Sequence, residues 1–117
     1  MDRATRRSPL AGAGAFETVL RSGRRREGEY LQVIAMAAAF DRGRSGFVIG
    51  RKALPRAVDR NRIRRMLRVT LRDARPALDA YDLIVRLKRG APRAAFPLLV
   101  TEAVRLLGDL AARPRES

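Results

Sequence analysis

The sequence predicts an α+β protein in which helices pack on one small β-sheet. Three segments carry apolar residues at helical spacing, and three others are short apolar runs containing β-branched and aromatic residues. The helical segments are residues 15–21, 58–75 and 94–112, and the strand-like runs are residues 30–40, 46–51 and 82–88. The chain has 117 residues, a length that usually forms one domain with a single core.

The first predicted helix is short and amphipathic. Phe16, Val19 and Leu20 are spaced i, i+3 and i+4, and Gly23 favours the end of the helix just before it. Residues 1–14 combine arginines with proline and glycine and have no apolar periodicity. We therefore expect them to form a flexible basic N-terminal arm.

Two apolar runs in the first half of the chain predict a β-hairpin. Residues 30–40 form a long strand candidate, and residues 46–51 follow after a short polar stretch with a central glycine. Pro55 is expected to close the second strand. The three consecutive arginines at residues 24–26 precede the hairpin and are predicted to lie in a loop.

The second half of the chain supplies one further strand and a long final helix. Residues 82–88 are the strand candidate, followed by a Gly and a Pro that end it. Residues 94–112 predict a helix that covers the core, in which Pro97 is tolerated only in the first turn. Residues 113–117 are expected to be a frayed tail, so the folded domain is predicted to span residues 15–112.

The charge balance indicates an acidic partner and excludes several kinds of active site. Lys and Arg number 26 against 12 Asp and Glu, a formal net charge of +14, which opposes compaction unless a polyanion neutralises it. The chain has neither Cys nor His, so disulfides, Cys/His zinc sites and Ser-His or Cys-His dyads are excluded. No apolar stretch is long enough to span a bilayer, and we expect a cytoplasmic protein.

The segment at residues 58–75 carries the strongest functional signal. At 100° per residue it separates into an apolar face and a cationic face. The apolar face consists of Ile63, Met66, Leu67, Thr70, Leu71 and Ala74, and the cationic face of Asn61, Arg64, Arg65, Arg68, Arg72 and Arg75. Asp59 is expected to cap the N-terminus of the helix. A solvated face normally mixes both signs of charge, so this nearly all-positive face indicates nucleic-acid binding.

Residues 51–68, RKALPRAVDRNRIRRMLR, resemble the signature of the bacterial ribonuclease P protein family. The mark of that family is Arg-Asn-Arg followed by further basic residues on a helix, here beginning at Arg60. The basic pair at residues 51–52, the Ala-Val at residues 57–58 and the position of Phe16 in a short helix before a basic loop support the resemblance. The similarity extends over nearly the whole chain.

The resemblance implies an α-β-β-β-α-β-α two-layer sandwich with a small mixed sheet and a left-handed β-α-β crossover, a fold that a ribosomal protein domain also uses. It implies a fourth strand, which we expect near residues 25–29. It further implies a monomer in a 1:1 complex with the catalytic RNA of ribonuclease P, which also binds the 5′ leader of precursor tRNA and assists endonucleolytic 5′ maturation. The RNA performs the cleavage, and Mg²⁺ is held by RNA and substrate rather than by this chain.

Site residues follow from the same resemblance. The RNA-binding set is Arg51, Lys52, Arg60, Asn61, Arg62, Arg64, Arg65, Arg68 and Arg72. Phe16, with Phe47 and Lys52, would line a cleft for the leader, where bases can stack on exposed rings. Core packing is the alternative role for either ring. The acidic pairs Glu27 with Glu29 and Asp79 with Asp82 are interpreted as ordinary surface charges rather than as metal ligands or acid–base groups.

Two other classes of protein remain as alternatives. A ribosomal or other structural RNA-binding protein also places a basic helix on a small sheet. A DNA-binding regulator would insert the helix at residues 58–75 into a major groove, but the sequence lacks the partner helix of a helix-turn-helix.

Overall fold

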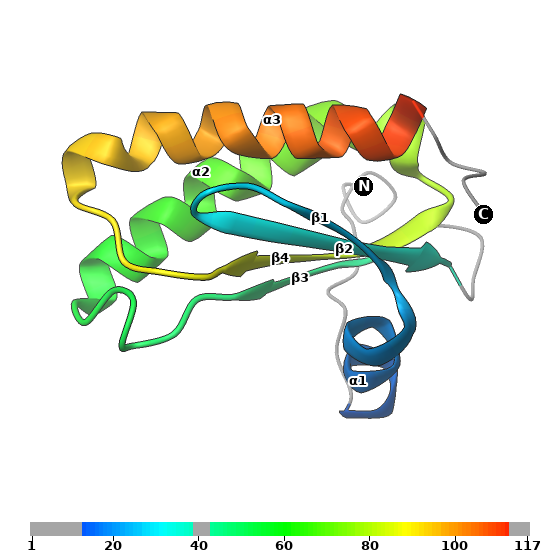
Figure 1. Cartoon of the computed structure of the whole chain (residues 1–117), viewed down its shortest axis with the longest axis horizontal. Coiled ribbons are helices and arrows are strands. Elements are labelled where there is room, and N and C mark those ends of the chain that lie inside the picture. The colour runs from blue at the N-terminus through cyan, green and yellow to red at the C-terminus, as the bar shows by residue number, and fades with distance from the viewer. Residues whose placement is uncertain (1–12, 39–42, 113–117) are drawn as a thin grey trace, which may run out of the picture.

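The computed structural model describes residues 13–38 and 43–112, and it has helices on both faces of one sheet (Figure 1). In chain order the elements are α1 (Ala13–Ser22), β1 (Arg24–Glu27), β2 (Leu31–Ala37), β3 (Ser45–Val48), α2 (Ala57–Leu78), β4 (Tyr81–Leu87), a short 3-10 helix (Arg93–Ala95) and α3 (Phe96–Ala112). This α-β-β-β-α-β-α order confirms the predicted α+β class. The proposed tail, and residues 1–12 of the proposed arm, lie outside the described residues.

The sheet has the strand order β1-β2-β4-β3. β2 is antiparallel to both β1 and β4, whereas β3 is parallel to β4. The predicted hairpin between residues 30–40 and 46–51 is therefore wrong, because β4 lies between these two strands. The physical reason is the composition of β4. Its residues 82–85 are buried, and a strand that is apolar on both faces is most stable in the centre of a sheet.

The run of arginines at residues 24–26 forms most of β1, where we expected a loop, and it supplies the fourth strand that the family resemblance implied. β1 is an edge strand whose side chains alternate between half-buried and exposed. Charged side chains suit such a position because one edge of the strand faces solvent and charge there prevents edge-to-edge pairing.

Two layers of helix enclose the sheet. α2 and α3 lie side by side on one face, and α1 lies against the other face (Figure 1). The larger core lies under α2 and α3 and includes Ile63, Leu67, Leu99, Leu83 and Val85. The smaller core lies under α1 and is built from Val19, Ile34 and Ile84. Residues 83, 84 and 85 thus serve the two cores alternately, as the pleat of a strand requires.

The apolar face predicted for α2 is confirmed. Ile63, Leu67, Thr70 and Leu71 are buried, and Met66 and Ala74 are partly buried against the same core. α2 also connects the parallel strands β3 and β4, so its axis and its rotation are set by the sheet beneath it. Because the apolar stripe faces the sheet, the opposite side of the helix must face solvent.

Two expectations for α2 are corrected. Arg75 is buried, with 2% of its surface exposed, and does not belong to the cationic face. It donates hydrogen bonds to the carbonyl oxygens of Leu78, Tyr81 and Arg44 and to Ser45 Oγ, at 2.6 to 3.0 Å. Its position faces the turns that begin β3 and β4, where backbone carbonyls need donors.

The second correction concerns the start of α2. The N-cap residue is Arg56, which makes no side-chain cap hydrogen bond. Asp59 lies in the first turn and accepts hydrogen bonds from Arg93 at 2.7 and 3.1 Å. Its carboxylate is still near the positive end of the helix dipole, but it ties α2 to the segment before α3 instead of capping the helix.

Candidate RNA interface

The predicted cations of α2 form one solvent-facing surface. We define the α2 basic surface as Arg60, Asn61, Arg62, Arg64, Arg65, Arg68 and Arg72. Arg62, Arg65, Arg68 and Arg72 are exposed together with Asn61, whereas Arg60 and Arg64 are partly buried. Arg51 and Lys52 are also exposed and lie in the loop that joins β3 to α2.

Carboxylates within the described residues form no ion pair with this surface. The ion pairs in this part of the chain join Arg44 to Asp82, Lys88 to Glu27, Arg89 to Glu29 and Arg93 to Asp59. None of them includes a residue of the α2 basic surface, nor Arg51 or Lys52. Uncompensated positive charges along one helix create a strong local potential that attracts a polyanion.

The three residues of the Arg-Asn-Arg motif have different local roles. Arg60 Nη1 donates to the carbonyl oxygens of Leu54 and Pro55, at 2.8 and 2.9 Å, and so joins the start of α2 to the preceding loop. Asn61 Oδ1 accepts a hydrogen bond from Arg64 Nη1 at 3.1 Å and orients that guanidinium. Arg62 is exposed. Within the motif, Arg60 anchors the start of α2, Asn61 orients Arg64, and Arg62 is exposed to solvent. The sequence did not indicate this division of roles.

Phe47 supports the α2 basic surface from below. Its ring is partly buried and packs against the larger core, and the guanidinium carbon of Arg68 lies 5.7 Å from the ring centroid. Such a cation–π contact restricts the side chain of Arg68 while leaving its other face open to a ligand. Phe47 thus lies on the face of the sheet that α2 covers.

Phe16 lies on the opposite face. It projects from α1, is partly buried, and packs against the smaller core together with Val48. Because Phe47 and Val48 are consecutive residues of one strand, their side chains point to opposite faces. The structure therefore does not bring Phe16 and Phe47 together, and the roles of both rings, like that of Lys52, stay predictions.

Most of the chain matches one protein family. The ribonuclease P family model matches residues 5–111. The chain belongs to the ribonuclease P protein family. The ribonuclease P protein component of Acidothermus cellulolyticus is 39% identical over 104 residues, 86% of each chain. That of Nitrosococcus oceani is 35% identical over 89 residues, 76% of this chain and 75% of the relative.

Solved structures of ribonuclease P proteins share the fold. The protein from Staphylococcus aureus superposes with a TM-score of 0.69 at 18% identity, covering 94% of this chain and 97% of the other. The protein from Thermotoga maritima superposes with a TM-score of 0.67 at 21% identity, covering 92% and 97%. As a ribonuclease P protein, the chain is a subunit of an endoribonuclease that processes tRNA, and its partner is the ribonuclease P RNA.

Three of the four acidic side chains considered above as possible metal ligands form ion pairs within this ribonuclease P protein. Of the pairs considered above, Glu27 binds Lys88 at 2.8 Å, Glu29 lies 3.6 Å from Arg89, and Asp82 binds Arg44 at 3.0 Å. Ribonuclease P in general depends on Mg²⁺, and within residues 13–38 and 43–112 no three acidic side chains are grouped to hold a metal ion. In the same residues, no helix is long and apolar enough to cross a membrane.

A hydrogen-bonded network on β1 and β2 was not predicted from the sequence. Gln32 accepts a hydrogen bond from Arg25 and donates one to Glu27, whose other oxygen accepts from Lys88. Hydrogen bonds from Lys88 and Gln32 lower the pKa of Glu27 below its ordinary value. Arg25 also donates to the carbonyl oxygen of Leu20 and so ties α1 to the sheet. The one sequence signal for this network is the carboxylate that ends the arginine run.

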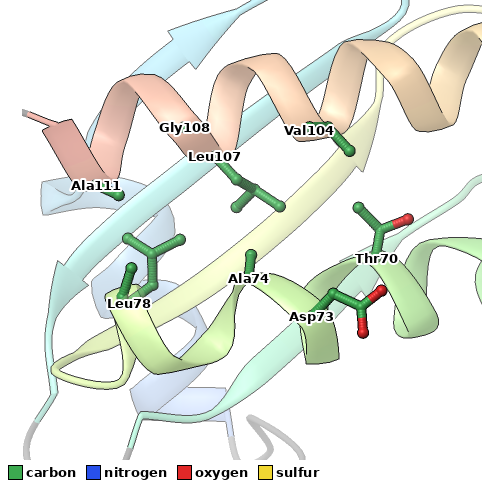
Figure 2. Close-up of a pocket in the computed structure, with 9 residues that line it drawn as sticks. Thr70, Asp73, Ala74, Leu78, Val104, Leu107, Gly108 and Ala111 are labelled. Atoms are coloured by element: carbon green, nitrogen blue, oxygen red, sulfur yellow. The ribbon is translucent and has the colours of Figure 1, made fainter.

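A groove of about 380 Å³ separates α2 from α3 on the side away from the sheet (Figure 2). Its walls are mainly small and apolar: Ala74, Ala77 and Leu78 come from α2, and Val104, Leu107, Gly108 and Ala111 from α3, with Thr70 and Asp73 also lining it. Within this lining Asp73 is the only charged side chain. The groove is therefore distinct from the α2 basic surface.

Proposed function

We propose that the α2 basic surface, with Arg51 and Lys52, binds the catalytic RNA of ribonuclease P in a 1:1 complex. The observation that carries the proposal is a row of exposed guanidinium groups that no carboxylate of the described residues neutralises. Guanidinium groups bind phosphates through paired hydrogen bonds and release condensed counterions from RNA. The support of Arg64 by Asn61 and of Arg68 by Phe47 reduces the side-chain entropy that binding would cost.

We also propose that the opposite face of the sheet binds the 5′ leader of precursor tRNA. We define the α1 face by the sheet residues that point toward the side of α1, together with Phe16 of α1. These sheet residues are Arg25, Glu27, Gln32, Ile34, Met36, Val48, Asp82, Ile84 and Arg86. Phe16 is only partly buried, so its ring can stack with an unpaired base. Arg51 and Lys52 follow β3 and precede α2, and they connect the two surfaces along the chain.

In this proposal the protein improves binding and leaves the cleavage step to the RNA. Cations placed between two polyanions offset the repulsion between their phosphates, an effect that otherwise requires Mg²⁺. The Mg²⁺ ions that participate in cleavage would be held by the RNA and the substrate. For a bacterial-type ribonuclease P protein that acts on precursor tRNA, we expect a cytoplasmic location.

Reconstitution with a ribonuclease P RNA at low Mg²⁺ tests this function. Cleavage of precursor tRNA should be stimulated by the protein, and the R65A/R68A variant should need more protein for the same stimulation. Absence of stimulation by the unmodified protein would contradict the proposal. Co-purification with ribosomal RNA in place of ribonuclease P RNA would favour the alternative of a structural RNA-binding protein.

A further inference from the structure

The central strand β4 presents a single exposed side chain. Tyr81 is partly buried, residues 82–85 and 87 are buried, and only Arg86 is exposed. A central strand in a sheet that has helices on both faces normally buries its side chains on both sides. The charged guanidinium at this position is not buried, so the smaller core does not include Arg86.

Arg86 lies on the α1 face. In the sheet register it pairs with Gln32 of β2 and with Val48 of β3. Ile84 is two residues earlier on the same face and belongs to the core under α1, together with the partly buried Phe16. Two residues along a strand span about 6.6 Å, so the Cα atom of Arg86 lies about that distance from the Cα atom of Ile84.

The polar neighbours of Arg86 are already engaged with one another. The amide of Gln32 accepts from Arg25 at 3.3 Å and donates to Glu27 at 2.9 Å. Both oxygens of Glu27 are used, one by Gln32 and the other by Lys88 at 2.8 Å. Among the described residues, no hydrogen bond or ion pair joins Arg86 to another side chain. The α1 face thus has an exposed guanidinium that no carboxylate of the described residues pairs with, and the same face carries a half-buried aromatic ring.

We propose that Arg86 is a substrate-positioning residue that binds a phosphate of the precursor tRNA leader as the leader crosses the α1 face. This inference rests on the proposed leader-binding function of that face. A phosphate matches an exposed guanidinium in charge and in the geometry of its donors. Since the Gln32 amide is engaged at both ends, the contact at this point of the face is made to the backbone and is indifferent to the base sequence.

The test compares precursor tRNAs with a single-nucleotide leader and with a leader of about ten nucleotides, a length within the range that one nucleic-acid-binding face covers. Binding to the holoenzyme is measured as a function of salt for the unmodified protein and for Arg86→Ala, Arg86→Lys and Phe16→Leu. Arg86→Ala should weaken binding of the long-leader substrate roughly tenfold at low salt, and reduce the salt slope by about 0.7, as expected for one contact to a single strand. Arg86→Lys should keep the slope and lose part of the affinity.

Arg105→Ala is the matched control. Arg105 is exposed on α3, which covers the opposite face of the sheet, and the substitution removes the same charge. This variant should bind both substrates as the unmodified protein does. Binding of Arg86→Ala to the ribonuclease P RNA alone should be unchanged, and its thermal unfolding should match that of the unmodified protein because the side chain is exposed.

The outcomes distinguish the leader-binding function of the α1 face from the role of Arg86. If the unmodified protein does not favour the longer leader, the leader-binding function of the α1 face is wrong, and the inference about Arg86 is wrong with it. If the preference exists and Phe16→Leu reduces it while Arg86→Ala does not, only the role of Arg86 is refuted. If Arg86→Ala weakens assembly with the ribonuclease P RNA, Arg86 contacts the RNA subunit and the inference is again refuted.

Discussion

The role of Arg75 provides a direct test of how the fold is held together. Arg75→Met keeps the length of the side chain and removes its charge and its donors. Four hydrogen bonds from the guanidinium are lost, to three carbonyl oxygens and one hydroxyl at 2.6 to 3.0 Å. A hydrogen bond to a charged group contributes about 1.5 to 3 kcal/mol, and the cost of burying the guanidinium offsets part of the sum. We therefore expect unfolding free energy to fall by about 3 to 5 kcal/mol.

Urea denaturation followed by circular dichroism measures this loss, and Arg72→Met is the control. Arg72 is on the same helix, three residues earlier, and is exposed, so its substitution should change unfolding free energy by no more than about 0.5 kcal/mol. The opposite pattern is expected for RNA binding: Arg72→Met weakens it, whereas Arg75→Met, at a temperature where the variant is folded, does not. A loss below about 1 kcal/mol for Arg75→Met would refute the structural role assigned to this residue.

Three further predictions concern the surface. Replacing Arg65 and Arg68 with Ala should flatten the salt dependence of binding to the ribonuclease P RNA by roughly one phosphate contact each, and an unchanged slope in a filter-binding assay would contradict the α2 basic surface. Gly108→Ala should stabilise α3 by about 0.5 to 1 kcal/mol in thermal or urea unfolding, because a Cβ atom there meets nothing within 4 Å; destabilisation would mean that the groove is not open. The lowered pKa of Glu27 means that its contribution to stability is present above the ordinary pKa of about 4.5 and is lost as the pH falls through the lower folded value. Glu27→Gln should remove the part of the pH dependence of the unfolding free energy that Glu27 causes. If the unfolding free energy of this variant changed between neutral and acidic pH as that of the unmodified protein does, the bond between Glu27 and Lys88 would contribute nothing to stability.

The helices could be read from the sequence more fully than the sheet. The apolar stripe of α2 was predicted residue by residue, since helical periodicity is local and one buried stripe decides the rotation of the helix. The strand segments were located as apolar runs, but their pairing was not. Residues 30–40 and 46–51 are close in sequence and suggested a hairpin, whereas the structure inserts β4 between them. A short apolar run indicates that a strand exists and carries little information about its neighbours.

The candidate site, like the fold, could be predicted only in part from the sequence. The sequence placed Arg65, Arg68 and Arg72 on the solvent-facing side of a helix, and the structure agrees. It also assigned Arg75 to that face from its angle on the helical wheel, and the structure buries it. An angle of this kind says nothing about the loops that pack against the end of a helix, and those loops supply the carbonyl oxygens that Arg75 binds.

By itself, the amino-acid sequence determined the α+β class, the two-sided character of α2, the large positive charge and the family. These properties depend on composition and on spacings within one segment, which remain the same wherever that segment is placed. Only the tertiary structure decided which strands are neighbours, which arginines are structural, and that Phe16 and Phe47 lie on opposite faces of the sheet. These properties depend on contacts between segments distant in the chain, and such contacts are selected by how all the apolar surfaces can be buried together.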